Sequence, residues 1–352
     1  MTHLCLHVKE TETAAFITWI LGISDTFFRL QKMAHTEEMQ WRNQTTITKF
    51  ILVGFSNLPH LQGLLFSVVL FLYLVTVTGN ILIILIITED SALHSPMYFF
   101  LKNLSFFEIC FTLVTVPKML VNLLADDKSI SFFGCALQMF FFFFFCCSEC
   151  FLLAAMAYDR YVAICNPLCY TTVMNQQVCW RMVGGVCMLG IPVALLQAAW
   201  LFNLPFCGPN VVNHFFCDGP PVLKLVCADT SLYEMQAMAS TLLFLILPFM
   251  LILISYIHIT ITILKMKSAE GRRKAFSTCS SHLIVVTLFY GSGTLMYLRP
   301  KSKYSPDVKK FLSLFYTVIT PMLNPIIYSL RNNEVKLALR RMLERKVFSW
   351  KW

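Results

Sequence analysis

Two acidic residues, Glu108 and Glu149, lie inside long apolar stretches of this chain. Asn80 and Asn324 lie at similar depth in two further apolar stretches. A charged side chain inside a bilayer is costly and is usually kept for a function. We therefore expect these four residues, from four helices, to share a hydrated polar core. Either a cation lies between the carboxylates or one of them carries a proton, because like charges in contact disfavour double ionisation; the alternative is a purely structural polar cluster.

The triplet Asp159-Arg160-Tyr161 ends the third apolar stretch. Glu149 and Arg160 are 11 residues apart, which is close to three helical turns and places both on one face, about 16 Å apart. That face is expected to look into a helix bundle. We hypothesise that Asp159 and Arg160 form a partly buried ion pair that opens on activation, as a two-state latch.

The cysteines fall into two groups by their surroundings. Cys146, Cys147, Cys150 and Cys187 lie in apolar runs, where a thiol behaves as a small hydrophobic group. A polar loop instead carries three cysteines at intervals of ten, Cys207, Cys217 and Cys227, and this spacing indicates an oxidised, extracellular loop. His214–Asp218 also resembles a metal site, but a disulfide-bonded cysteine is no thiolate ligand, which argues against metal binding.

The composition requires a membrane to position these residues. The chain has 352 residues, of which 57% are hydrophobic and 13% charged, whereas soluble domains carry about 25% charged residues. A membrane-spanning helix needs about 20 apolar residues, and backbone in lipid must satisfy its own hydrogen bonds, which predicts helices. Seven such runs occur: Leu64–Ile87, Met97–Leu120, Ala136–Tyr161, Met182–Phe202, Ala237–Leu264, Phe276–Leu298 and Phe311–Leu330.

The orientation follows from charge, glycosylation and oxidation. The net charge of +9 is carried by short loops and the tail, which suits the anionic inner leaflet better than nucleic acid. The loop between the fifth and sixth runs and the C-terminal tail are basic and should be cytoplasmic; the basic loop between the sixth and seventh runs disagrees. Asn43, in Asn43-Gln44-Thr45, is a glycan acceptor on the same side as the cysteine loop. We therefore place the N-terminus outside and the C-terminus inside.

Three segments follow from this topology. Residues 1–61 form an extracellular segment, residues 62–330 the seven-helix bundle, and residues 331–352 a cytoplasmic tail. Within the tail, Asn333–Lys346 has apolar residues at helical spacing and predicts an amphipathic helix on the inner leaflet; a disordered basic tail is the alternative. Residues 1–38 form an extension to which we assign no function, and Met39 offers an alternative start.

The chain resembles the odorant (olfactory) receptors, which are class A G-protein-coupled receptors. The matching runs are Gly79–Asn80, Leu93–Leu101, Met156–Cys165, Ser255–Tyr256, Lys274–Leu283 and Pro321–Tyr328. The resemblance extends from about Asn43 to Glu344. Glu108 replaces a more usual aspartate, Cys169 a usual histidine, and the N-terminal extension is atypical.

This resemblance implies an all-α membrane fold and a receptor that signals through a heterotrimeric, stimulatory G protein to raise cyclic AMP. Arg160 would engage the G protein, Tyr256 and Tyr328 would rearrange around it, and Asn324-Pro325 would form a hinge. Cys135 would bridge to Cys217, and Cys207 to Cys227; four cysteines by themselves allow three pairings.

The ligand implied by this family placement is small, volatile and largely apolar. The outer half of the third run, Gln138–Ser148, contains no acid to pair with an amine, and Phe311–Leu330 contains no lysine for a Schiff base. Aromatic and other soft side chains with a few hydroxyls suit such a molecule, and no cofactor is implied. The expected walls are Phe142, Phe143, Cys146, Cys147, Phe244, Tyr290, Thr294 and Tyr297.

Three functions other than odorant reception are alternatives for this chain. A transporter or channel would favour internal repeats or interrupted helices, and no repeat is visible. An enzyme is disfavoured because HExxH and GxSxG motifs are absent from the sequence. A chemosensory receptor outside the nose stays open, since tissue is not encoded in these residues.

Overall fold

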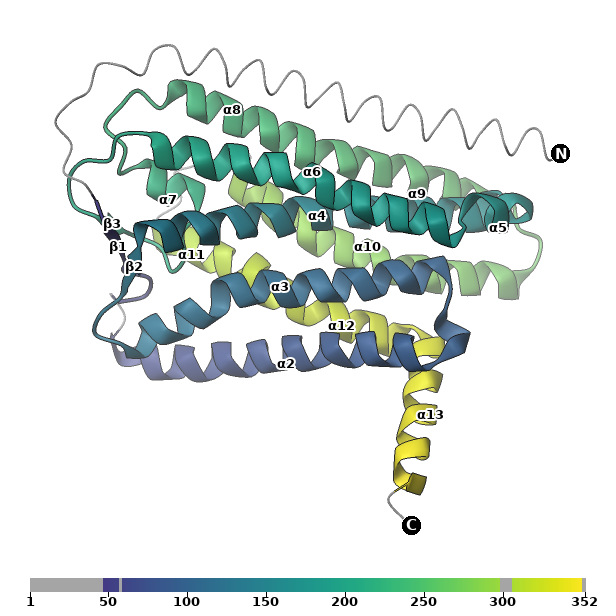
Figure 1. Ribbon diagram of the computed structural model, residues 1–352. Helices are drawn as coiled ribbons and strands as arrows, with labels where there is room; N and C mark the ends of the chain where they lie inside the picture. Colours follow the sequence, from purple (N-terminus) through teal and green to yellow (C-terminus); the bar gives the residue numbers. More distant parts are fainter. Residues whose placement is uncertain (1–46, 57–58, 298–305, 350–352) are drawn as a thin grey trace.

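The computed structural model of the chain describes residues 47–56, 59–297 and 306–349. The predicted glycan acceptor Asn43 and the extension 1–38 lie outside the described residues. Within the described residues the fold is mostly helical, with a small sheet at one end (Figure 1).

Seven helical segments are long and apolar enough to cross a membrane, which confirms the predicted spans. They run side by side in one bundle (Figure 1). The segments consist of α2 (Gln62–Glu89), α3 (Pro96–Leu124), α4 (Phe132–Cys165), α6 (Gln176–Asn203), α8 with α9 (Ser231–Thr241 and Leu247–Lys265), α10 (Ala269–Tyr297), and α11 with α12 (Pro306–Leu314 and Thr320–Arg331).

Local sequence explains where several helices begin. The Ser131 hydroxyl accepts a hydrogen bond from the Gly134 amide at the start of α4. The Asn175 side chain accepts one from the Val178 amide at the start of α6. Both side chains satisfy amides that have no partner within the first turn. Short helices α5 (Tyr170–Val173) and α7 (Gly219–Leu223) lie in loops.

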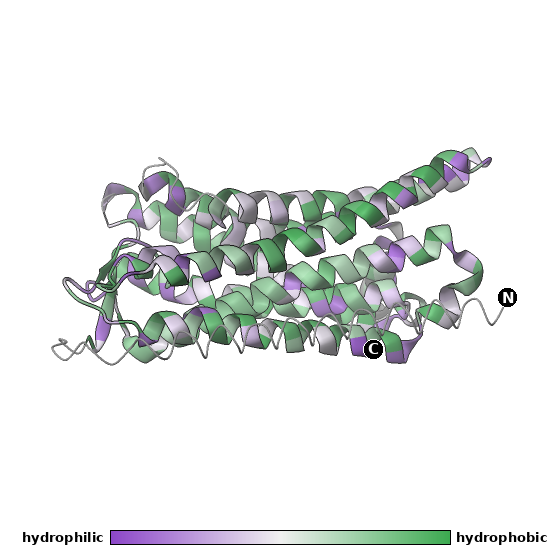
Figure 2. Cartoon of the chain, turned by 90° about the horizontal axis from the view of Figure 1, so that it is seen from above, coloured by the Kyte–Doolittle hydropathy of each residue, from purple (hydrophilic) through white to green (hydrophobic). Residues whose placement is uncertain are grey.

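Helix α4 is the central helix of the bundle. In its most apolar window 72% of residues are buried, against 28% in that of α2. Large side chains of α2, such as Leu64 and Phe71, remain 62% and 65% exposed in the absence of lipid. Hydrophobic residues dominate along the helices, and hydrophilic ones gather toward the two ends (Figure 2). This distribution is that of a bundle surrounded by lipid.

Two prolines interrupt the fifth and seventh spans through π-helical segments, Leu242–Ile246 and Phe315–Ile319. Pro248 and Pro321 each lie two residues after the end of such a segment. Proline has no N–H, so the carbonyl four residues earlier loses its α-helical donor. Those carbonyls, of Phe244 and Thr317, both lie inside the π-helical segments. The resemblance implied a hinge at Asn324-Pro325, and the structure places an irregularity of the seventh span in the turn before Pro321.

Close helix contact requires glycine at two positions. A Cβ atom added to Gly190 of α6 would lie 2.8 Å from the Ser148 hydroxyl and 3.0 Å from the Phe144 carbonyl of α4. A Cβ atom on Gly79 of α2 would lie 3.1 Å from the Pro325 ring of α12. These glycines bring α6 and α12 against the helices that carry the polar core.

A three-stranded sheet closes one end of the bundle. Strand β1 (Lys49–Leu52) pairs antiparallel with β2 (Ser129–Ser131) and parallel with β3 (Val211–Val212). This sheet could not be predicted from the sequence, because strands of two to four residues are too short to show an alternating pattern.

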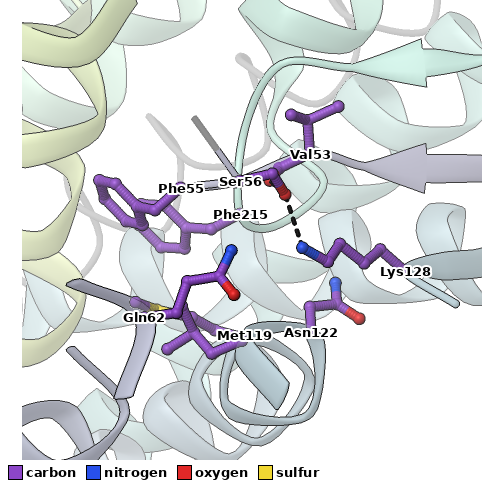
Figure 3. A pocket seen from close by; sticks show the side chains of 10 residues that line it. Val53, Phe55, Ser56, Gln62, Met119, Asn122, Lys128 and Phe215 are labelled. Atoms are coloured by element: carbon purple, nitrogen blue, oxygen red, sulfur yellow. Dashed lines mark hydrogen bonds between the residues drawn. The ribbon is translucent and has the colours of Figure 1, made fainter. Parts of the chain in front are cut away.

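A small pocket beside this sheet is lined by residues of the N-terminal segment and of α3 (Figure 3). The Lys128 ammonium donates a hydrogen bond to the Ser56 hydroxyl at 2.7 Å. The pocket has a volume of about 10 Å³, which is enough for one water molecule. Asn122 lines it, and both polar atoms of the Asn122 side chain lack a partner among the described residues.

Helix α13 (Asn333–Ser349) leaves the bundle after α12 at a sharp angle (Figure 1). Val335 and Ala338 are buried against the bundle. The Tyr98 hydroxyl donates to Glu334 at 2.8 Å, and Arg341 forms an ion pair with Asp90 at 2.8 Å. An amphipathic helix therefore occurs where the sequence predicted Asn333–Lys346.

Candidate functional site

The predicted polar core is assembled in the middle of the bundle. The Asn324 side-chain amide donates a hydrogen bond to Glu108, and Asn80 is also within hydrogen-bonding reach of that carboxyl group. Glu149 lies close enough to interact electrostatically with Glu108. All four residues are at most 3% exposed.

Four oxygen atoms of this core have no hydrogen-bond partner within the described part of the chain: Asn80 Oδ1, Glu108 Oε2, Glu149 Oε1 and Asn324 Oδ1. Buried polar atoms without partners are costly. A cation bound by such oxygen atoms would lower this cost, and so would a proton on one of the two neighbouring carboxyl groups. Both sequence-based alternatives therefore remain compatible with the arrangement.

Arg160 lies at the opposite end of α4 from the disulfides and is 4% exposed. Its guanidinium lies beside Tyr256 of α9 and Tyr328 of α12. The Nε and Nη1 atoms of Arg160 have no hydrogen-bond partner among the described residues. Two of the predicted switch residues, Tyr256 and Tyr328, are thus brought together beside the incompletely hydrogen-bonded Arg160.

Asp159 does not pair with Arg160 in this structure. Its carboxylate accepts a hydrogen bond from the Tyr170 hydroxyl at 2.9 Å. The ion pairs found between described residues are those of Lys310 and Arg341 with aspartates. Burial and the Asp159 carboxylate raise the pKa of Tyr170, so its hydroxyl stays a donor. The paired state of the latch hypothesis stays a prediction, and Tyr170, from the following loop, is a partner that the sequence analysis missed.

The switch region contains a further residue without a predicted role. His282 of α10 is fully buried, and its Nδ1 atom lies 2.8 Å from the Tyr256 hydroxyl. His282 therefore links α10 to the tyrosine that lies beside Arg160. The run Lys274–Leu283 contains it, but a buried histidine is usually a satisfied core residue, so the residue type alone gave no signal. Tyr161 stacks edge-on against His258 of α9.

Both disulfides implied by the resemblance are confirmed. Cys135 bonds to Cys217 with a Cα–Cα distance of 5.5 Å, and Cys207 bonds to Cys227 at 5.8 Å. Both distances suit a disulfide. The first joins the start of α4 to the loop between α6 and α8, and the second closes that loop on itself.

The Cys135–Cys217 bond holds this loop against the end of the bundle that carries the sheet. Phe216 and Asp218 flank Cys217, and both are fully buried. Phe216 packs on Phe142 of α4 with a centroid distance of 5.0 Å. Asp218 Oδ1 accepts hydrogen bonds from the Gly219 amide at 2.8 Å and the Tyr297 hydroxyl of α10 at 3.2 Å. Asp218 Oδ2 has no partner among the described residues.

The predicted ligand-contacting residues form two groups. The outer group lies beneath the loop: Phe142 packs 6.1 Å from Tyr316, and Phe143 packs 6.4 Å from Tyr297. Cys146 lies near Tyr297 and Tyr316. Tyr316 of the seventh span was not predicted, since the family placement drew only on spans three, five and six.

The inner group surrounds Cys150 of α4. Tyr290 donates to the Cys150 carbonyl at 2.8 Å and lies near Cys147. Phe244 packs edge-on against Phe151 with a centroid distance of 6.2 Å. Thr294 lies one turn from Tyr290 on α10 and is half-buried. In the Phe140–Phe145 run, Phe142 and Phe145 are buried whereas Phe141 is 37% exposed, which resolves which rings face inward.

Comparison with known proteins gives the family. A family model of olfactory receptors matches residues 69–346. Human olfactory receptor 10A7 is 64% identical over 305 residues, which cover 87% of this chain and 96% of that protein. Human olfactory receptor 10A5 is 62% identical over 304 residues (86% and 96%), and mouse olfactory receptor 5AP2 is 51% identical over 309 residues (88% and 98%).

The chain belongs to the olfactory receptor family. It is a class A G-protein-coupled receptor and a multi-pass protein of the plasma membrane, and it is not an enzyme, as the sequence predicted. The polar core, the Arg160 cluster and the loop-covered aromatic residues are therefore parts of one olfactory receptor.

The loop of this receptor should make its stability depend on pH through Asp218. Burial raises the pKa of the Asp218 carboxyl group to about 7, against about 3.9 in an unfolded chain. Between these values the folded receptor binds a proton that the unfolded chain does not, so stability falls as pH rises through this window. We expect the melting temperature of the wild type, relative to Asp218→Asn, to be highest near the acid end of this window and to decline toward its upper end.

The Asp218→Asn comparison isolates this group. Burial, with the nearby Lys310 ammonium, lowers the pKa of His214 to about 3, but His214 titrates equally in both proteins and cancels in the difference. A difference in melting temperature that is constant between about pH 4 and 7 would contradict the buried, protonated Asp218.

Proposed function

We propose that this olfactory receptor binds a small, volatile, largely apolar molecule within the bundle and activates a stimulatory G protein that raises cyclic AMP. The observation that carries the proposal is the position of Arg160, buried beside Tyr256 and Tyr328 and aligned along α4 with the polar core. A buried charge without full hydrogen bonding contributes little to packing. An exchange of its partners between two arrangements is what a two-state switch requires.

The proposed ligand region lies beneath the loop that carries Phe216 and Asp218. Aromatic rings from α4, α10 and the seventh span converge there. Such surfaces favour apolar ligands through burial, and a few polar groups fix the orientation. Tyr297, Tyr316 and the unpartnered Asp218 Oδ2 favour an odorant with one polar oxygen over a pure hydrocarbon.

The proposed orientation places the sheet and the disulfides outside the cell, and the Arg160 end and α13 inside. Disulfides form in oxidising compartments, which supports this assignment. A tag on the N-terminus should be stained on intact cells, and a tag on the C-terminus only after permeabilisation. The reverse pattern would overturn the orientation without affecting the fold.

The functional test is expression of the receptor with a stimulatory olfactory-type G protein and a cyclic AMP reporter. A panel of volatile alcohols, aldehydes, esters and matched hydrocarbons is applied to cells with confirmed surface receptor. We expect responses to some oxygenated volatiles and weaker ones to the matched hydrocarbons. Silence across a broad panel, at normal surface expression, would contradict the proposal.

A further inference from the structure

A groove of about 710 Å³ separates the inner ends of α9 and α10. Figure 1 shows these two helices joined by a short connection at the end of the bundle opposite the sheet. The groove is distinct from the Arg160 cluster, because neither Arg160 nor Tyr256 lines it. Its lining residues are Thr260, Ile263, Leu264, Ala269, Arg272, Arg273, Phe276, Ser277 and Ser280.

The α9 wall of the groove extends from the buried Ile263 to the exposed side of the helix. The buried positions near the inner end of α9 are Tyr256, Ile259 and Ile263, which define its inward face. Thr260 and Leu264 come one residue later, about 100° around the helix, and both are exposed. Leu264 is 70% exposed, so the groove presents an uncovered apolar side chain on this side of α9.

The α10 wall carries charged residues at the start of the helix and the apolar Phe276 further along it. Cys279 and His282 are buried and mark its inward face, whereas Phe276 is 67% exposed. Arg272 and Arg273 lie in the first turns of α10, and Ser280 lies about 12 Å further along the axis. The groove therefore extends from a charged mouth into the depth where acyl chains lie.

The charge at the mouth is positive. Arg272 and Arg273 are exposed, and Lys265 and Lys267 lie just before α10. Glu270 is the acidic side chain in the first turn of α10, and it leaves an excess of positive charge. Arginine pairs well with phosphate oxygens through its planar fork of donors, and the hydroxyl of Ser277 is exposed beside it.

We propose that this groove binds an anionic phospholipid of the inner leaflet, with its phosphate at Arg272 and Arg273 and one acyl chain along Leu264 and Phe276. A bound lipid wedged between α9 and α10 favours the arrangement in which these helix ends stand apart. This end of the receptor is cytoplasmic by the proposed orientation, on which the assignment to the inner leaflet rests.

The test uses the full-length receptor in nanodiscs of phosphatidylcholine that contain phosphatidylserine with a photoactivatable group on one acyl chain. After irradiation, labelled peptides are identified by mass spectrometry. We expect labelling concentrated on Thr260–Leu264 and Phe276–Ser280. In the double variant Arg272→Gln/Arg273→Gln, labelling of these peptides should be about tenfold lower than in the wild type. Each basic residue near an anionic surface contributes several-fold to binding.

A matched control removes the same charge elsewhere. Lys336 and Arg340 are exposed on α13, and Lys336→Gln/Arg340→Gln should leave labelling of the groove unchanged. Leu264→Trp, which fills the groove without changing charge, should also lower labelling. Melting temperatures of all variants identify any that fail to fold.

Three outcomes would overturn the proposal. Equal loss in both double variants would indicate general electrostatic attraction rather than a site. Equal labelling by photoactivatable phosphatidylcholine would indicate an apolar crevice that does not select charge. Unchanged labelling with lowered G-protein activation in Arg272→Gln/Arg273→Gln would indicate a protein contact. Because both faces of the nanodisc carry the same lipid, labelling does not depend on odorant response or orientation, so failure of the proposed function is recognised separately.

Discussion

Arg160→Ala is expected to abolish the cyclic AMP response while leaving the receptor at the cell surface. The guanidinium is 4% exposed and lies beside Tyr256 and Tyr328, so it joins α4 to α9 and α12. Two of its nitrogens have no partner among the described residues. Removing an incompletely satisfied buried cation costs little folding stability, whereas it removes the group proposed to contact the G protein.

Arg160→Lys separates charge from geometry. Lysine keeps the positive charge but lacks the planar fork of donors, so we expect a strongly reduced response rather than a normal one. The matched control is Arg181→Ala, since Arg181 lies in the first turns of α6 and is exposed. Surface staining and cyclic AMP are measured on the same cells. A normal odorant response in Arg160→Ala would refute the assignment of Arg160 as the switch.

The sequence predicted those parts of the fold that depend on composition over many residues. The seven spans were found because a helix crossing lipid must be apolar along its whole length. The polar core was found for the same reason, since Glu108, Glu149 and the two asparagines stand out against apolar neighbours. The resemblance, not the spacing, supplied the pairing of Cys135 with Cys217.

The sequence could not predict contacts that depend on how loops fold back. Asp218 was weighed as a metal ligand, but the structure joins it to Tyr297 of α10. Tyr170 joins Asp159 across the turn that follows α4. In each of these two hydrogen bonds the partners belong to different segments of the chain. No periodic pattern in either segment predicts that they come into contact. The β1 strand was missed for the related reason that its partners lie about 80 and 160 residues further along the chain.

Replacing Cys135 and Cys217 together by serine is expected to cause the largest loss of stability in the receptor. The cross-link spans 82 residues, and the chain-entropy relation gives about 4.5 kcal/mol for a closed loop of that length. The Cys207–Cys227 bond spans 20 residues, and the same relation gives about 3.3 kcal/mol. We therefore expect Cys207→Ser/Cys227→Ser to retain more surface receptor and a higher melting temperature than Cys135→Ser/Cys217→Ser.

The two disulfides also differ in what they position. Cys217 lies between Phe216 and Asp218, so its bond to α4 holds both residues over the proposed ligand region, whereas the second bond joins two parts of the loop to each other. Receptor recovered from the Cys135→Ser/Cys217→Ser variant should therefore respond to odorants less than its surface amount explains. The other double variant should respond in proportion to its surface amount. An equal loss of stability and of response per surface receptor in the two double variants would contradict this prediction. Neither loop length nor the placement of Asp218 would then explain the importance of the Cys135–Cys217 bond.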